Sequence, residues 1–164
     1  MAALKPFYYD SANKLWKKIT SPDTLDASVT STLATTLNVT ADAALVIGNA
    51  VYISAAGHVD LASAAAIGTA RCIGLVKDAS VESAATGDVV VSGELSATTG
   101  QWDVVAGTTG GLTAGTDYYL SKANAGKLVT DISAYTTGDF VVYVGHAVST
   151  TKMKVNPQTQ IIAL

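Results

Sequence analysis

Two histidines and a few carboxylates are the residues of this 164-residue chain that could take part in acid–base or metal chemistry. His58 and His146 each follow a glycine, but no spacing of His, Cys and Asp offers the converging ligands that a metal site requires. Glu94 and Asp103 flank a glycine-rich bend and could form a glycosidase-type pair, although aspartate is far more common there as a turn residue. Spacing does not exclude a Ser-His-Asp triad, but the sequence has no Gly-x-Ser-x-Gly elbow. We therefore predict no metal, no cofactor and no enzymatic activity.

A glycine-rich segment at residues 107–111 has the composition of a phosphate-binding loop. Such a loop needs a Lys-Ser or Lys-Thr pair after it, and a helix that begins there and points its amide groups at the anion. The pair is missing after Gly111 and no helix is expected to begin there. The sequence therefore predicts no phosphate site.

Lysines and aromatic residues gather near the N-terminus. Lys14, Lys17 and Lys18 surround Trp16, in a chain whose net charge is −3. Basic and aromatic residues together can bind nucleic acid, but three lysines in an acidic chain are weak support for that function, and we predict no nucleic-acid contact. Complementarity to an acidic protein surface is the better-motivated interpretation. The residues predicted to contact a partner or another subunit are Tyr8, Tyr9, Lys14, Trp16, Lys17 and Lys18.

These contact residues belong to a predicted hairpin, with short strands at residues 7–9 and 14–19. A hairpin alone is marginally stable in water, so either the body of the same subunit or a partner must cover its aromatic residues. A turn at residues 21–23 marks the predicted boundary. We expect an N-terminal arm at residues 1–26 and a β domain at residues 27–164.

The β domain is organised around a hairpin that occurs twice. Residues 48–59 and 115–128 each begin with glycine, continue through a short apolar run that ends in serine, and turn through small residues into a second apolar run. The later segments 72–76 and 143–147 correspond in the same order, which predicts a body with an internal repeat.

Alternation along the second hairpin places Tyr119 on one face with Asp117 and Ser121, and Tyr118 on the other face. We predict that one of these tyrosines belongs to the core and the other to an interface.

Three further segments carry secondary-structure signals. Residues 61–69 are rich in alanine and predict a helix of at most about two turns that ends at Gly68. Residues 102–105 predict a short strand between flexible turns, and the apolar tail at 160–164 is expected to pair or dock. Many short strands between turn signals indicate an all-β sandwich or barrel-like domain, here with an internally repeated hairpin unit and an extended N-terminal arm.

Composition narrows the cellular setting. Charged residues form 14% of the chain, against about 25% in typical soluble proteins, so the surface is either covered by neighbours or neutral and rich in hydroxyl groups. The single Cys72 excludes an internal disulfide and fits folding in a reducing cytoplasm. The N-terminus lacks the apolar segment of a signal peptide. The sequence has no stretch of about 18 apolar residues, so we predict no membrane contact.

Taken in order, these motifs form a recognisable series. Its members are the segments 8–10, 15–19, 48–54, 73–76, 87–89, 93–95, 110–121 and 144–147. The series resembles the small β-rich accessory proteins of tailed-bacteriophage virions, above all head decoration (cement) proteins and related head-fibre modules. The similarity spans most of residues 40–155.

The resemblance implies a homotrimer that binds the major capsid protein on the outside of the capsid and clamps adjacent capsid subunits. It implies a place on the virion exterior after synthesis in the host cytoplasm, and it brings no catalytic residue. Two alternatives stay open. One is a head or tail fibre module that contacts the host surface, with carbohydrate bound through exposed aromatic residues such as Trp102 or Tyr118. The other is a cell-surface adhesin module.

Overall fold

The structure is a computed structural model that describes residues 7–10, 15–18, 34–158 and 161–164. The chain divides into two compact units, Met1–Ser31 and Thr32–Leu164, which are treated separately below. The boundary predicted after residue 26 lies outside the described residues.

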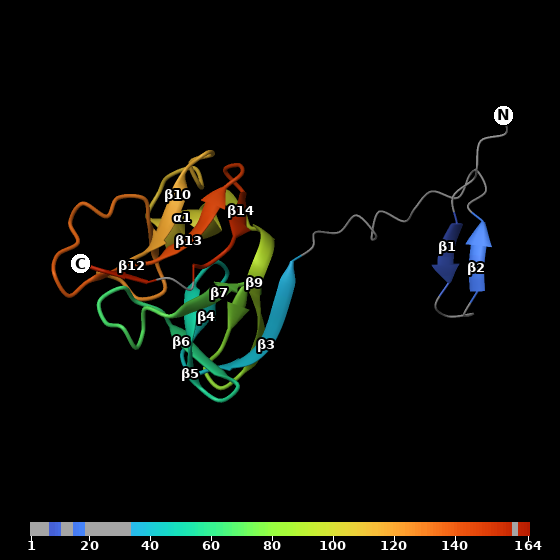
Figure 1. Cartoon of the computed structure of the whole chain (residues 1–164), viewed down its shortest axis with the longest axis horizontal. Helices are drawn as coiled ribbons and strands as arrows, with labels where there is room; N and C mark the ends of the chain where they lie inside the picture. The colour runs from blue at the N-terminus through green and yellow to red at the C-terminus, as the bar shows by residue number, and fades with distance from the viewer. Residues whose placement is uncertain (1–6, 11–14, 19–33, 159–160) are drawn as a thin grey trace. The chain divides into compact units, whose positions relative to one another are not determined.

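The described part of the first unit is a two-stranded antiparallel hairpin (Figure 1). Strand β1 (Phe7–Asp10) pairs with β2 (Leu15–Lys18). A hairpin with short strands at residues 7–9 and 14–19 around a polar turn was predicted here, although Leu15 and Lys18 break strict alternation.

The described part of the second unit contains thirteen strands and one helix, which confirms the all-β prediction (Figure 1). The helix is α1 (Thr99–Ala106). The strands are β3 (Thr35–Ala41), β4 (Leu45–Val46), β5 (Ala50–Ala55), β6 (His58–Leu61), β7 (Cys72–Val76), β8 (Ser80–Val81), β9 (Thr86–Ser96), β10 (Asp117–Leu120), β11 (Leu128–Val129), β12 (Phe140–Val141), β13 (Tyr143–Ala147), β14 (Lys152–Val155) and β15 (Ile162–Ala163).

Five strands close into a small barrel. They follow the order β9-β3-β6-β5-β7, and the ring closes because β7 also pairs with β9, through Leu75↔Val90 and Val76↔Val89. All neighbours are antiparallel except β3 and β6. One apolar cluster draws mostly valine and alanine from all five strands, as expected for a narrow barrel filled by its own side chains. The buried members of this cluster are Val39, Ala41, Leu45, Val51, Val59, Val76, Val81 and Val89.

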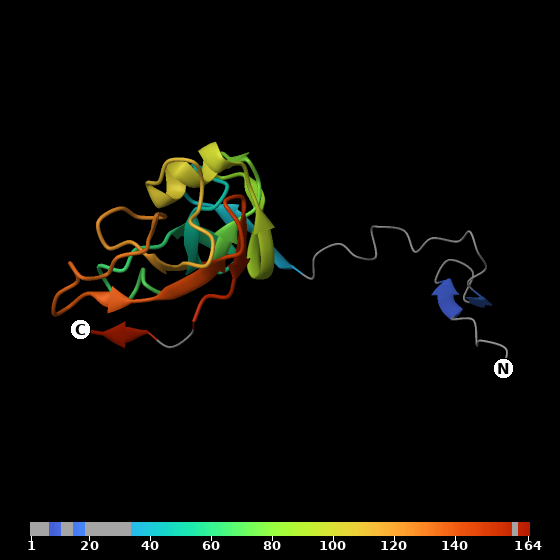
Figure 2. The same ribbon diagram turned by 90° about the horizontal axis from the view of Figure 1, so that it is seen from above.

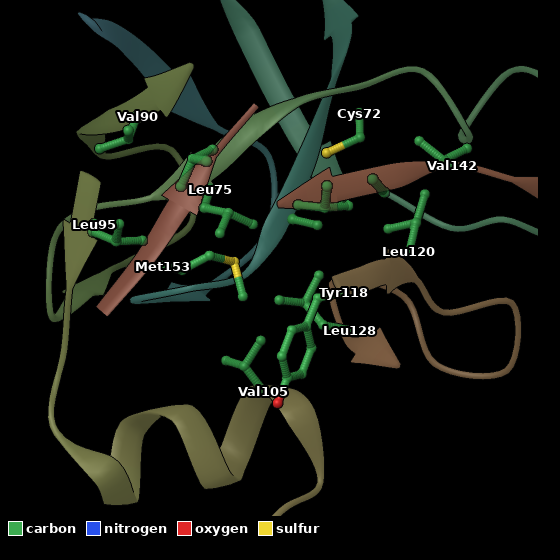
Figure 3. Packing of buried hydrophobic residues seen from close by; sticks show 14 of the residues in the cluster. Cys72, Leu75, Val90, Leu95, Val105, Tyr118, Leu120, Leu128, Val142 and Met153 are labelled. Carbon is green, nitrogen blue, oxygen red and sulfur yellow. The ribbon is translucent and has the colours of Figure 1, made fainter. Parts of the chain in front are cut away.

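The long strand β9 links the barrel to a second sheet. Its C-terminal half pairs with β14 from Gly93↔Val155 to Ser96↔Lys152, and the sheet continues through β13 and β10 to β11. A larger apolar cluster fills the space between this sheet, the barrel and α1, and it includes Tyr118 and Met153 (Figure 3). Trp102 belongs to the same cluster. Figure 2 shows α1 and the C-terminal strand β15 on opposite sides of the second unit.

The predicted internal repeat is present in the hydrogen bonding. The amide of Gly48 donates to the carbonyl of Val76 at 2.8 Å, and the amide of Gly115 donates to the carbonyl of Ala147 at 2.8 Å. In each copy the first hairpin strand pairs on its other side with the later strand, β5 with β7 and β10 with β13.

The two copies also share an irregularity in the ladder. The register shifts between Val51 and Tyr52 in the first copy, and between Tyr118 and Tyr119 in the second. When the two copies are aligned at their first glycines, Gly48 and Gly115, Val51 and Tyr52 correspond to Tyr118 and Tyr119. The repeat therefore extends to the position of the bulge.

The strand predicted at residues 102–105 is wrong, because these residues belong to α1. A capping box starts the helix: the Thr98 hydroxyl accepts from the Gln101 amide, and the Gln101 side chain accepts from the Thr98 amide. Gly107 ends the helix in a left-handed conformation, φ +65°. Both caps outweigh the strand preference of the Val-Val pair within the helix.

The helix predicted at residues 61–69 is also wrong. Leu61 ends β6, and a series of turns follows in which the amides of Thr69 and Ala70 both donate to the carbonyl of Ala66. Alanine serves here as the smallest packing residue, because Ala62, Ala64 and Ala70 are fully buried against the larger cluster.

The described part of the C-terminal tail pairs as predicted, because β15 is antiparallel to β12 through Phe140↔Ala163 and Val141↔Ile162. The longest described helix, α1, has eight residues, and no described helix is long and apolar enough to cross a bilayer.

Candidate functional site

Five of the six predicted contact residues lie in the hairpin of the first unit. Tyr8 and Tyr9 lie in β1, and Trp16, Lys17 and Lys18 lie in β2, whereas Lys14 lies outside the described residues. The register places Tyr8 opposite Lys17 and Tyr9 opposite Trp16. Residues directly opposite in an antiparallel pair have Cα atoms about 4.5–5.5 Å apart. The register therefore pairs a lysine position with a tyrosine position, and a tyrosine position with a tryptophan position.

Charge is divided unequally between the two units. The first unit has four lysines and three aspartates, a net charge of +1, while the second has five lysines and one arginine against ten carboxylates, a net charge of −4. The basic residues of the hairpin are therefore part of a unit whose charge is opposite to that of the β body.

Each of the two histidines lies beside one surface aspartate. No group of three or more His, Cys, Asp or Glu residues that could hold a metal occurs in the described ranges. His58 Nδ1 contacts Asp42 Oδ1 at 2.8 Å, and His146 Nδ1 contacts Asp117 Oδ1 at 2.7 Å, both on the surface. Ser54 also donates to Asp42, and this bond and the one with His58 lower the pKa of that carboxyl. In a catalytic triad the histidine stands between serine and aspartate, whereas here the aspartate does.

The glycine-rich segment binds a carboxylate of its own chain. Asp103 accepts from the amide of Gly111 at 2.7 Å, the amide of Gly110 at 3.1 Å and the hydroxyl of Thr108 at 3.0 Å. These bonds, that of Gly111 first, hold the pKa of Asp103 below its usual value. Glu94, the other carboxylate of the possible glycosidase pair, lies 2.8 Å from Lys152 Nζ. Both carboxylates therefore have structural partners.

The aromatic residues considered for carbohydrate binding are in the core, so that part of the fibre alternative is wrong. Trp102 and Tyr118 are fully buried. Trp102 Nε1 donates to the carbonyl of Thr151 at 3.1 Å, and the Tyr118 hydroxyl accepts from the amide of Thr113 at 3.0 Å. A sugar ring cannot stack on either side chain.

Tyr118 is thus the core member of the tyrosine pair, as alternation predicted for one of the two. Tyr119 lies half-buried, in an edge-to-face contact with Tyr143 with ring centroids 6.0 Å apart. Ser121, predicted on the same face as Tyr119, is instead buried, because its amide bonds the carbonyl of Lys127 and its hydroxyl accepts from Asn124.

The second unit has an apolar groove that sequence analysis missed, with a volume of about 510 Å³. Its lining joins the segment before β7, the start of β7 and the chain before β15. The lining residues are Ile67, Arg71, Cys72, Ile73, Gln158 and Ile161. We refer to this site as the Arg71 groove.

The Arg71 groove combines exposed aliphatic surface with a single cation. Ile67 is 49% exposed, and Arg71 is exposed and is the only arginine of the chain. Within the described ranges, no carboxylate lies within ion-pair distance of Arg71. Burial raises the pKa of the Cys72 thiol to about 12, so this part of the lining is neutral.

The sequence was compared with protein-family models and with curated proteins, and neither comparison found a match.

Proposed function

We propose that this protein is a structural, non-enzymatic virion component that binds the outside of a tailed-bacteriophage capsid and stabilises it by clamping adjacent subunits. Its partners in this proposal are the major capsid protein and two further copies of itself, in a homotrimer. It joins the capsid exterior after synthesis in the host cytoplasm.

The observation that carries the proposal is the difference in charge and composition between the hairpin, which is basic and aromatic, and the acidic β body. A two-stranded hairpin of four residues a side has too little apolar surface for stability alone, so its residues need a second surface. The lysines of that hairpin suit an acidic partner surface. The order of sequence motifs adds support, since it resembles that of capsid decoration proteins.

The proposed mechanism is binding linkage. A protein that binds only the assembled shell stabilises it by the free energy of binding, which is about 2.7 kcal/mol per site when the free concentration is about 100 times the Kd. Many copies act on one shell, so a modest affinity at each site raises the stability of the whole particle. No reaction and no cofactor are needed.

A charge-reversal experiment tests the role of the hairpin. The variant replaces Lys14, Lys17 and Lys18 with glutamate, and the matched control replaces three lysines of the body. The control lysines are Lys77, Lys152 and Lys154. Both variants lose the same charge, and surface ion pairs contribute only about 0–1 kcal/mol, so both should fold.

Each variant is added to capsids stripped of this protein, and bound copies are counted by quantitative gel analysis. We expect the hairpin variant to lose binding and the control to retain most of it. Equal occupancy for the two variants would contradict the proposal. Light scattering tests the trimer, for which a mass near three times 16.7 kDa is expected.

A further inference from the structure

We infer that the Arg71 groove binds an extended segment of a partner protein, one that presents a carboxylate beside aliphatic side chains. The inference rests on the groove alone and does not require the proposed function.

The first argument is an open strand edge. Strand β9 pairs with β7 only at Leu75 and Val76, and then turns to β14 from Gly93 onward. On that side, within the described ranges, Ile73 has no strand partner, whereas the amide of the buried Cys72 donates to the carbonyl of Ala70 at 2.8 Å. An exposed strand edge is where an extended peptide gains main-chain hydrogen bonds.

The second argument concerns the part of the groove lining that comes from the chain after β14. The chain after β14 is held on its far side, because the amides of Asn156 and Gln158 donate to the carbonyls of Val144 and Tyr143. Ile161 then contacts the large apolar cluster and also lines the groove. The described lining therefore joins the start of β7 with Gln158 and Ile161, two parts of the chain that are far apart in sequence.

The third argument is the chemistry of the lining. The aliphatic residues Ile67, Ile73 and Ile161 favour apolar side chains, and the groove volume of about 510 Å³ is within the range of about 300–1,000 Å³ found for binding pockets. Arg71 adds a planar, permanently charged donor that fits a carboxylate with two parallel hydrogen bonds.

The charge distribution of the second unit favours binding of a carboxylate at Arg71 over binding elsewhere on its surface. The second unit has a net charge of −4, so an acidic segment is disfavoured over most of its surface. Arg71 has no described carboxylate within ion-pair distance, and it lies beside exposed aliphatic surface. A segment that alternates aspartate with valine or isoleucine matches both features and has the strand propensity to pair with β7.

The experiment uses the full chain with isoleucine methyl groups labelled for NMR. The probe is a capped six-residue peptide, Val-Asp-Val-Ile-Asp-Val, and the control peptide replaces both aspartates with asparagine, which keeps shape and removes charge. We expect the aspartate peptide to shift the methyl signals of Ile67, Ile73 and Ile161. Ile53 is 46% exposed but does not line the groove, so its signal should not move.

Variants then separate charge from apolar contact. We expect the aspartate peptide to bind at least tenfold more tightly than the asparagine peptide, and Arg71→Gln to abolish that preference. Lys154→Gln, at another exposed cation, should leave it unchanged. Ile67→Ser should weaken both peptides alike.

Equal affinity for the two peptides, shifts confined to other residues, or no binding at millimolar peptide would overturn the inference. Because these variants leave Lys14, Lys17 and Lys18 intact, failure here is distinguishable from failure of the capsid-binding proposal.

Discussion

Alanine at Gly74 and at Gly145 should destabilise the second unit by similar amounts, because these glycines occupy equivalent positions in the two repeat copies. A Cβ atom added to Gly145 would lie 2.5 Å from the carbonyl oxygen of Lys154, on the neighbouring strand β14. A Cβ atom added to Gly74 would meet the carbonyl oxygen of Val90 on β9 even more closely. Real Cβ atoms essentially never come within 3.0 Å of another heavy atom.

The magnitude follows from the movement that is needed. Ordinary van der Waals contact begins at 3.4 Å, so the neighbouring strand at Gly145 must retreat by about 0.9 Å. The obstacle is main chain and cannot rotate away. Overpacking costs about 1–3 kcal/mol and a weakened ladder hydrogen bond about 1 kcal/mol, so we expect a loss of about 2–4 kcal/mol per substitution. Total stabilities are about 5–15 kcal/mol, so the effect is large.

Urea unfolding followed by far-UV circular dichroism measures the change in the free energy of unfolding. Gly68→Ala and Gly100→Ala are matched controls, because a Cβ atom at either meets no heavy atom within 4 Å and neither glycine has a positive φ. Gly100 lies in α1, where replacement by alanine should raise the free energy of unfolding by about 0.5–1 kcal/mol. Surface substitutions usually change the free energy of unfolding by no more than about 0.5 kcal/mol. If Gly74→Ala and Gly145→Ala change it by no more than that, the close packing of the repeat is refuted.

Three further predictions concern single groups. Thr98→Ala removes the capping box shared with Gln101 and should cost about 1 kcal/mol in urea unfolding; an unchanged stability would show that the cap contributes nothing. The Cys72 thiol, with its pKa raised to about 12, should not react with a thiol reagent at pH 8 in the folded protein and should react at once in guanidinium; fast labelling of the native chain would contradict its burial. Lys122 lies 2.7 Å from Asp139 and is the main cause of its lowered pKa, so Lys122→Met should destabilise at pH 7. The difference from the parent should close as pH falls below about 3.9 and through the lower folded pKa, where the carboxyl is protonated; a gap that persists in acid would assign the effect to packing.

The β body was predictable because its signals are local. The glycine at the start of each hairpin, the run that follows it and the glycine of the turn are all visible at residues 48–59 and 115–128. Alternation also assigned one tyrosine of the pair at 118 and 119 to the core. Closure of the barrel was not predictable, because it depends on one long strand, β9, that pairs with three others.

The two wrong secondary-structure predictions, at residues 102–105 and 61–69, failed for opposite reasons. The helix α1 had a local signal, the Thr98 to Gln101 capping box and Gly107, that should have outweighed the strand preference of valine. The alanine-rich segment 61–69 had helix propensity, but tertiary packing selects alanine there for its size. Residue propensity alone therefore predicted the wrong secondary structure in both segments.

The Arg71 groove could not be found from sequence, because residues 67–73 and 158–161 meet only through the sheet topology. The one available signal was that Arg71 is the only arginine of the chain. The hairpin residues were predicted as contact residues because aromatic and basic residues cluster within the first 18 positions, and their contact role stays a prediction.

The most direct test of a capsid-stabilising role is the temperature at which particles release their DNA, measured with and without this protein by the fluorescence of a DNA-binding dye. We predict that particles without the protein release DNA at a lower temperature, and that adding the purified full chain back restores the original value. An unchanged release temperature, together with a loss of adsorption to host cells, would contradict the proposal and favour a fibre module.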